Sequence, residues 1–283
     1  MENHKNIRTD AQKNTNKNPQ VYFVGAGPGA ADLITVRGMK LIGMADVIIY
    51  AGSLVNPELL GYAKQDAEIH NSAYMTLEDV IDVMKKSADS GLTVCRLHTG
   101  DPSLYGAVRE QMDALDELGI RYESCPGVSA AFGAAAAMDL EFTLPGISQS
   151  LIITRMAGRT SVPPKESIES WAAHDSTMAV YLSTGMLAEL SKRLIDGGYR
   201  EDTPAVIASR ATWPDEGYFR CTVAALAETA AEHGITKTAL ILVGDVLGGK
   251  DYEKSRLYDK GFATGFRPAS TDGRSDDADG GQL

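Results

Sequence analysis

The stretch VYFVGAGPG, at residues 21–29, indicates a buried strand that runs straight into a turn with three glycines and a proline. Glycine permits positive φ and leaves room for a ligand against the main chain. A second apolar run, at residues 92–97, ends in a similar way at Thr99-Gly100-Asp101-Pro102. Two strand-to-loop junctions of this kind predict one ligand-binding edge of a parallel sheet.

The first glycine loop also fits the dinucleotide-binding pattern G-x-G-x-x-G/A, through Gly25, Gly27 and Ala30. That pattern needs a helix that opens inside the glycine turn, whereas the best helix start here is Thr35. It also needs an acidic residue after the second strand, but the strand at residues 47–50 ends in Ala-Gly-Ser. A nicotinamide-dependent or flavin enzyme is therefore the weaker interpretation of this loop.

Strands and helices alternate along the first half of the chain, which is typical of a parallel sheet covered on both faces. The second half predicts a mixed sheet, because Asp215-Glu216-Gly217 has the composition of a hairpin between strands at 204–208 and 218–222. We therefore expect an α/β protein with two α/β domains. The first has a parallel sheet and spans residues 19–138, a linker follows at 139–148, and the second has a mixed sheet and spans 149–249.

Both ends of the chain lack the apolar residues that would offset the entropy of ordering them. Residues 1–18 are rich in Asn and Lys, and we predict a disordered tail there. Residues 250–283 are predicted to form an extension that is disordered from about residue 268, where Pro, Ser, Gly and Asp dominate.

The overall charge restricts the partners of this protein. The 283 residues include 27 basic and 38 acidic side chains, for a net charge of -11. A global acidic field argues against a nucleic-acid or anionic-membrane partner, although local arginines can still bind a small anionic substrate.

Several features predict a cytoplasmic protein. The N-terminus has no apolar core of a secretory signal, and no apolar run approaches the ~18 residues of a membrane span. The three cysteines are scattered along the chain, at Cys95, Cys125 and Cys221. We expect them to be small buried apolar side chains, with free thiols in a reducing compartment. No metal site is predicted, because His70 and His98 lack partners at ligand spacing.

Several separated motifs together resemble the tetrapyrrole methylase family of S-adenosylmethionine-dependent enzymes. They are the glycine loop with the Asp-Leu-Ile-Thr that follows it, the Thr-Gly-Asp-Pro loop, and Pro126-Gly127-Val128-Ser129-Ala130. Segments 50–55, 69–73, 154–160 and 211–216 further resemble the branch that methylates C11 of precorrin-4 or cobalt-precorrin-4. The resemblance covers about residues 20–249. It implies two α/β domains with the active site in the cleft between them, a tetrapyrrole substrate and a homodimer.

The resemblance also implies which residues contact S-adenosylmethionine. The family's contact positions fall on loops of both halves of this chain, at Pro28, Gly100, Asp101, Tyr105, Ser129, Ala130, Leu182, Ala211, Thr238 and Ala239. Leu182 stands where relatives often carry Met, and it keeps the apolar volume. Asp101 has a second interpretation from the residues alone, because an Asp at this place can cap the helix that follows.

The substrate of this family is a flat macrocycle edged with acetate and propionate groups, which needs cations at the rim of its site. Arg155 and Arg159, four apart after a strand, can each form a planar fork with a carboxylate, although they could instead be a solvated pair. Ser53, Asn71 and Ser72 are expected to supply neutral hydrogen bonds. No general base is assigned, and no metal is required because the sulfonium is already activated.

The sequence leaves other functions open. One is another member of the family, which acts at a different ring position or on diphthamide. The others are a nicotinamide-dependent oxidoreductase and a binding module that keeps the cofactor fold without catalysis. The C11-like segments weigh against the first of these, and the intact glycine and Gly-Asp-Pro loops weigh against the binding module. Trp213 could cover the macrocycle or fill core.

Overall fold

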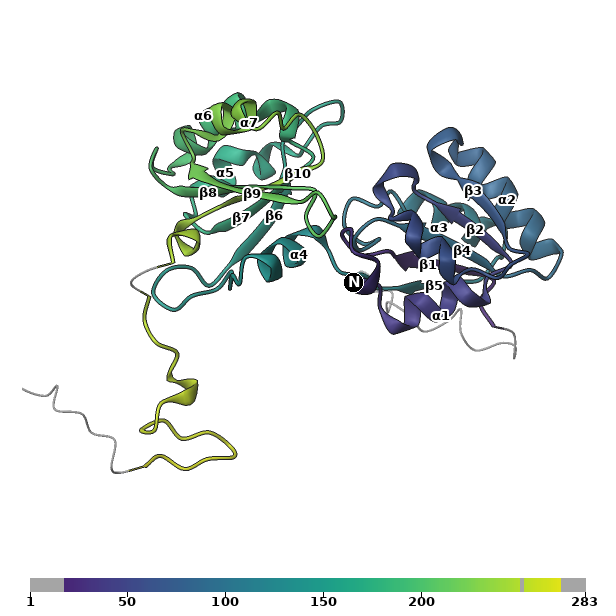
Figure 1. Cartoon of the computed structure of the whole chain (residues 1–283), viewed down its shortest axis with the longest axis horizontal. Helices are drawn as coiled ribbons and strands as arrows, with labels where there is room; N and C mark the ends of the chain where they lie inside the picture. The colour runs from purple at the N-terminus through teal and green to yellow at the C-terminus, as the bar shows by residue number, and fades with distance from the viewer. Residues whose placement is uncertain (1–17, 250–251, 271–283) are drawn as a thin grey trace, which may run out of the picture. The chain divides into compact units, whose positions relative to one another are not determined.

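The computed structural model of the chain describes residues 18–249 and 252–270 and divides into two compact units, shown in Figure 1. The first unit runs to Ala137 and also includes Arg210–Glu216, and the second comprises the other residues from Met138 onward. The predicted disordered tails lie outside the described residues, apart from residue 18 and residues 268–270.

The first unit contains a five-stranded sheet in the order β3-β2-β4-β1-β5, and each pair of neighbouring strands is parallel. The parallel sheet predicted for this half is confirmed. Its strands are β1 (Val21–Gly25), β2 (Val47–Tyr50), β3 (Glu68–Asn71), β4 (Val94–His98) and β5 (Tyr122–Cys125). Its helices are α1 (Val36–Met44), α2 (Leu77–Asp89), α3 (Arg109–Glu117) and α4 (Ala130–Ala137).

Both faces of this sheet are buried. Phe23 packs with Met84 of α2 on one face, whereas the next residue, Val24, packs with Ile42 of α1 on the other. Successive strand residues point to opposite faces, so β1 must be apolar throughout. Because all five strands are parallel, their carboxyl ends lie along one edge, and the loops after β1, β4 and β5 leave from it.

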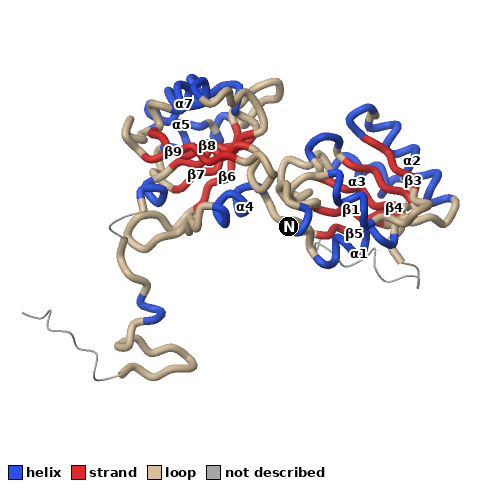
Figure 2. Tube along the Cα trace, viewed as in Figure 1, coloured by secondary structure: helices blue, strands red, loops and turns tan. Residues whose placement is uncertain are grey.

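The second unit contains a mixed sheet in the order β6-β7-β10-β8-β9, as predicted. β6 and β7 are parallel, and the other neighbours are antiparallel, including the β8–β9 pair. Figure 2 shows helices on one side of these strands, and Leu190 and Leu226 of those helices pack with Val180 and Ile241. The elements are β6 (Leu151–Arg155), α5 (Ile168–Ala172), β7 (Thr177–Tyr181), α6 (Leu187–Gly197), β8 (Pro204–Ser209), β9 (Gly217–Thr222), α7 (Leu226–Glu232) and β10 (Ala239–Val243).

Three local expectations are corrected by the structure. The helix expected over residues 104–118 begins only at Arg109, because Tyr105 and Ala107 adopt φ values of 55° and 48°, which a right-handed helix excludes. The strand expected at 149–153 spans Leu151–Arg155. Strand β3 was not expected, since Glu-Ile-His-Asn is a short and mostly polar edge strand.

Other local expectations are confirmed. Thr35 caps α1, and its hydroxyl accepts a hydrogen bond from the Gly38 N–H at 3.0 Å. Thr76 caps α2 in a reciprocal capping box with Asp79. Within the described part of the chain, no helix has both the length and the apolar character that crossing a membrane needs.

Candidate functional site

Three glycine-containing loops meet at the carboxyl edge of the first unit's sheet. The Gly27 N–H donates to the Gly100 carbonyl at 3.2 Å, and the Gly100 N–H donates back to the Gly27 carbonyl at 2.8 Å. A Cβ built on Gly127, in the third loop, would lie 2.1 Å from the Gly100 oxygen and 2.7 Å from the Gly25 Cα. The loops therefore touch through their backbones, and the prediction that both strand-to-loop junctions share one edge is confirmed.

Asp101 fastens the second loop to the third. Its Oδ1 accepts a hydrogen bond from the Ser103 N–H at 2.8 Å, and its Oδ2 accepts one from the Gly127 N–H at 2.9 Å. Burial opposes ionisation of this carboxyl, but the hydrogen bonds from Ser103 and Gly127 outweigh it and hold the pKa of Asp101 below its usual range. Both carboxylate oxygens are thus used to hold the loops in place.

The first glycine loop is held by residues that lie far away in the sequence. The Trp213 Nε1–H donates to the Pro28 carbonyl at 3.0 Å, and the Ala30 N–H donates to the Thr212 hydroxyl at 3.0 Å. A Cβ on Gly29 would lie 2.4 Å from the Trp213 ring, so only glycine fits beneath it. Trp213 is half-buried and packs against this loop.

Asn56 also holds the first loop, and together with Thr212 and Trp213 it forms what we call the clamp on this loop. Its side-chain amide is buried and donates to the Gly29 carbonyl at 2.9 Å, while its Oδ1 accepts from the Glu58 N–H. Sequence reasoning did not select Asn56 or Thr212. Asn56 precedes Pro57, which is typical of an ordinary turn, and the position of Thr212 depends on a contact across 182 residues.

The helix after the first loop begins too late for dinucleotide binding. A short 3₁₀ turn at Ala31–Leu33 follows the glycines, and α1 starts only at Val36. Pyrophosphate binding needs the helix N-terminus inside the glycine turn. The geometry therefore disagrees with a nicotinamide or flavin site.

The model of the family described as Tetrapyrrole (Corrin/Porphyrin) Methylases matches residues 20–227. The chain belongs to this family. It is 53% identical to the cobalt-precorrin-4 C(11)-methyltransferase of Methanocaldococcus jannaschii over 88% of this chain and 96% of that protein. It is 44% identical to the precorrin-4 C(11)-methyltransferase of Pseudomonas aeruginosa over 88% of this chain and 98% of that protein.

The fold also resembles solved tetrapyrrole methylases. A structure of a cobalamin biosynthetic enzyme, cobalt precorrin-4 methyltransferase, has a TM-score of 0.79 and 44% sequence identity. The match covers 80% of this chain and 95% of that one. The parallel sheet and the mixed sheet described above thus form the fold of a tetrapyrrole methylase.

The first unit of this tetrapyrrole methylase holds most of the predicted cofactor residues around its glycine loops. Gly100 has a φ of 60°, which favours glycine, and a Cβ built there would lie 3.8 Å from the Ser129 Cα, in ordinary van der Waals contact with the third loop. Tyr105 is exposed, Ser129 is buried at the start of α4, and Ala130 is the first residue of that helix. Pro28 and Ala211 are buried beside the clamp on the first loop.

The second unit brings the remaining predicted cofactor residues to one end of β7 and β10. Leu182 follows β7 with a φ of 54° and is 69% exposed, and Thr238 precedes β10 with a φ of 54°. The Thr184 hydroxyl donates to the Ala239 carbonyl at 3.0 Å, which joins the two segments. Leu182 therefore presents an exposed apolar side chain beside these joined segments.

Ser53 follows strand β2, Asn71 is the last residue of β3, and Ser72 comes directly after it. The Ser72 hydroxyl donates to the Tyr50 carbonyl at 3.1 Å, and the Asn71 Oδ1 accepts from the Ala73 N–H at 3.0 Å. A Cβ on Gly52, the residue before Ser53, would lie 3.1 Å from the Asn71 Oδ1. The structure thus groups these predicted substrate residues at the edge that carries the glycine loops.

Arg155 and Arg159 differ in their surroundings. The Arg155 guanidinium donates to the Met156 and Thr160 carbonyls and to the Ser161 carbonyl, at 3.1, 3.2 and 2.7 Å. Arg159 is exposed and makes no hydrogen bond or ion pair with any residue that the structure describes. Arg155 therefore shapes the loop, and Arg159 presents a free cation.

His98, at the end of β4, is buried and uncharged. Burial, and then the neighbouring Arg96 cation, lowers the pKa of its imidazole to about 3. Its Nε2 atom has no hydrogen-bond partner among the described residues. The described residues also contain no cluster of three His, Cys, Asp or Glu side chains arranged to hold a metal ion.

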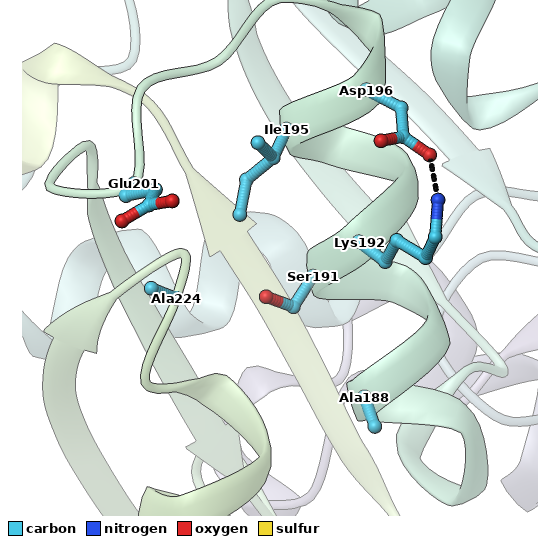
Figure 3. Close-up of a pocket in the computed structure, with 7 residues that line it drawn as sticks. All are labelled: Ala188, Ser191, Lys192, Ile195, Asp196, Glu201 and Ala224. Carbon is cyan, nitrogen blue, oxygen red and sulfur yellow. Dashed lines mark hydrogen bonds and ion pairs between the residues drawn. The ribbon is translucent and has the colours of Figure 1, made fainter.

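A hollow of about 340 Å³ on the second unit contains none of the predicted site residues. Figure 3 shows Ser191 and Ile195 of α6 facing Glu201 across it, while Lys192 turns aside to pair with Asp196. The hollow is open to solvent, and Lys192, the one cationic residue that lines it, is already paired with Asp196.

Proposed function

We propose that the chain is an S-adenosylmethionine-dependent methyltransferase that methylates C11 of precorrin-4 or cobalt-precorrin-4 in corrin biosynthesis. This proposal is supported by sequence identity, which is higher to the C11-methyltransferases than to a relative with another name. Relatives that are 40–53% identical over 84–88% of the chain bear the name precorrin-4 or cobalt-precorrin-4 C(11)-methyltransferase. A uroporphyrinogen-III C-methyltransferase of Bacillus subtilis is only 33% identical. The two C11-methyltransferase names differ only in whether the substrate contains cobalt, and that cobalt would be part of the substrate and not of the protein.

The residues around the glycine loops fit S-adenosylmethionine. Its sulfonium supplies an activated methyl group and leaves as a neutral thioether. The N-terminus of α4, where Ala130 begins the helix, offers main-chain donors to its polar groups, and the glycine loops beside it are joined through their own backbones. Asp101 and Trp213 hold the loops in one arrangement, because their polar groups bond to the loops themselves. The protein's contribution to the rate is then alignment and exclusion of water.

The substrate residues follow the same division between positioning and contact. Arg159 is the free cation expected to bind a macrocycle carboxylate, and Arg155 holds the loop that carries it. Ser53, Asn71 and Ser72 are proposed to bind the macrocycle with neutral groups. Tyr105 and Leu182, both exposed, supply apolar surface for the donor or the macrocycle.

The decisive experiment is transfer of a ¹³C-labelled methyl group from the donor to precorrin-4, prepared with and without cobalt. We expect one new methyl group on C11, located by NMR of the product. A methyl group at another ring carbon would move the chain to a different branch of the family. A protein that binds NAD at micromolar concentration and ignores S-adenosylhomocysteine would overturn the proposal altogether.

We also propose that the enzyme works as a cytoplasmic homodimer, which the family resemblance implies. The three free cysteines suit a reducing compartment. Light scattering on the purified protein should give twice the chain mass of 30.2 kDa. A chain-sized particle at micromolar concentration would refute the dimer.

A further inference from the structure

Arg96 is a buried cation without a counterion. It is the third residue of β4, and it is 6% exposed. Its Nε donates to the Gln111 Oε1 at 3.1 Å, and its Nη1 donates to the Ile49 carbonyl at 3.2 Å. No carboxylate in the described part of the chain pairs with it. Burial lowers the pKa of Arg96 only to about 10, so the guanidinium stays charged at neutral pH.

The guanidinium has donors to spare. Arginine carries five N–H groups, and two of them have partners here, so three are left, including both on Nη2. A buried charge is costly unless it is paired, and breaking such a pair is strongly destabilising. A buried arginine whose hydrogen bonds go only to neutral acceptors can therefore still bind an anion.

Arg96 also borders a cavity. Arg96 lines a cavity of about 150 Å³ together with Ser72, Thr76, Gln111 and Glu110. This is room for on the order of five water molecules, enough for a carboxylate on a short methylene arm. The Ser72 hydroxyl already donates to the Tyr50 carbonyl, so the donors for an anion come from Arg96.

The place of the cavity suggests where the anion comes from. Ser72 belongs to the substrate group after β2 and β3, so the cavity opens next to the residues proposed to bind the macrocycle. An acetate or propionate arm of a bound tetrapyrrole could enter beside Ser72. Glu110 is exposed at the start of α3 and lines the same cavity, so its charge opposes an incoming anion.

We propose that Arg96 is a carboxylate-binding residue for the macrocycle, reached through the cavity between Ser72 and Gln111. The proposal rests on the proposed function, because it takes its ligand from that substrate. The chemistry recognised is a carboxylate in a planar, charge-assisted contact with the guanidinium end. A free small carboxylate in the cell would satisfy the same chemistry, so the test separates the two sources.

The test uses uroporphyrin III, a stable porphyrin with eight carboxylates, as a fluorescent probe of the full-length protein. Arg96→Met should weaken probe binding by about tenfold to a hundredfold, as expected for loss of a charge-assisted hydrogen bond. Glu110→Gln should tighten it by about twofold to fivefold, because a surface charge contributes little. Arg109→Met, which removes an exposed arginine paired with Asp113 on the same helix, is the matched control and should change nothing.

The outcomes distinguish this inference from the proposed function. If Arg96→Met fails to fold, the exposed Glu110→Gln variant alone decides, and unchanged probe affinity there overturns the proposal. Acetate could raise the melting temperature of the wild type but not of Arg96→Met, while neither substitution changes probe affinity. In that case a free carboxylate is the ligand, and the macrocycle assignment is wrong. Weaker S-adenosylhomocysteine binding in Arg96→Met would also overturn it, by pointing to the donor's own carboxylate. If the enzyme methylates C11 normally and neither substitution changes probe affinity, the proposed methyltransferase function stands. The carboxylate site at Arg96 is then wrong.

Discussion

The clamp on the first glycine loop predicts a specific effect of Trp213→Phe. Phenylalanine keeps an aromatic ring over Gly29 but cannot donate to the Pro28 carbonyl, which now accepts the indole N–H at 3.0 Å. Pro28 is buried, so its carbonyl loses a partner that water cannot easily replace. Leaving a buried acceptor unsatisfied costs about 1–3 kcal/mol.

This cost should appear as weaker cofactor binding. If the loop must hold its present shape to bind the donor, a penalty of about 1–2 kcal/mol lowers S-adenosylhomocysteine affinity by about 5- to 30-fold. Isothermal titration calorimetry measures that change directly. Urea unfolding of the same variant shows how much of the penalty falls on the fold instead.

The other tryptophan supplies the control. Trp171→Phe alters a partly buried ring that packs on the core of the second unit and should leave S-adenosylhomocysteine affinity unchanged. That variant also leaves Trp213 as the sole tryptophan, so its fluorescence should respond when ligand reaches the loop. If Trp213→Phe is less stable yet binds S-adenosylhomocysteine like the wild type, the first loop does not belong to the donor site.

Three further substitutions test the remaining parts of the site. Gly100→Val should fold yet bind S-adenosylhomocysteine much more weakly, because it adds bulk and strains a φ of 60°; unchanged affinity by calorimetry would remove this loop from the site. Asp101→Asn should lower the free energy of unfolding at pH 7, since the folded pKa of Asp101 lies below its ordinary 3.8. The stabilisation is present above pH 3.8 and is lost as the pH falls through the folded pKa, so urea titrations of wild type and variant should converge in acid. Arg159→Ala should raise the KM for the macrocycle by about tenfold to a hundredfold at unchanged S-adenosylhomocysteine affinity, whereas wild-type kinetics would make Arg159 an ordinary surface charge.

The parts of the fold that depend on local chemistry could be predicted from the sequence. The buried strands at residues 21–25 and 47–50 are continuous apolar runs, and Thr35 and Thr76 have the side chains of helix caps. Strand β3 could not be found in this way. It lies at the sheet edge with half its side chains in water, so it needs little apolar sequence to form.

The contacts that organise the site depend on residues far apart in the chain. Nothing in segment 210–216 itself reveals that Trp213 and Thr212 bond to residues 28–30, because no local pattern reports a partner more than 180 positions away. Arg96 did carry a readable signal. It is the one charged residue within the apolar run at 92–97, in a strand that the parallel sheet must bury.

The polar side chains at the glycine loops act mainly on the protein itself. Asp101 uses both carboxylate oxygens on Ser103 and Gly127, and Trp213 and Asn56 use their N–H groups on the first loop. Contacts with the methyl donor should therefore come largely from main-chain groups, which truncation of a side chain leaves in place. It follows that variants at these positions weaken binding through loop conformation, so their losses of affinity and of stability should rise together. A variant such as Leu182→Ala, which truncates a side chain that is 69% exposed, should instead lose affinity far more than stability. Plotting the two losses against each other across the set separates residues that hold the loops from the surface that the donor touches.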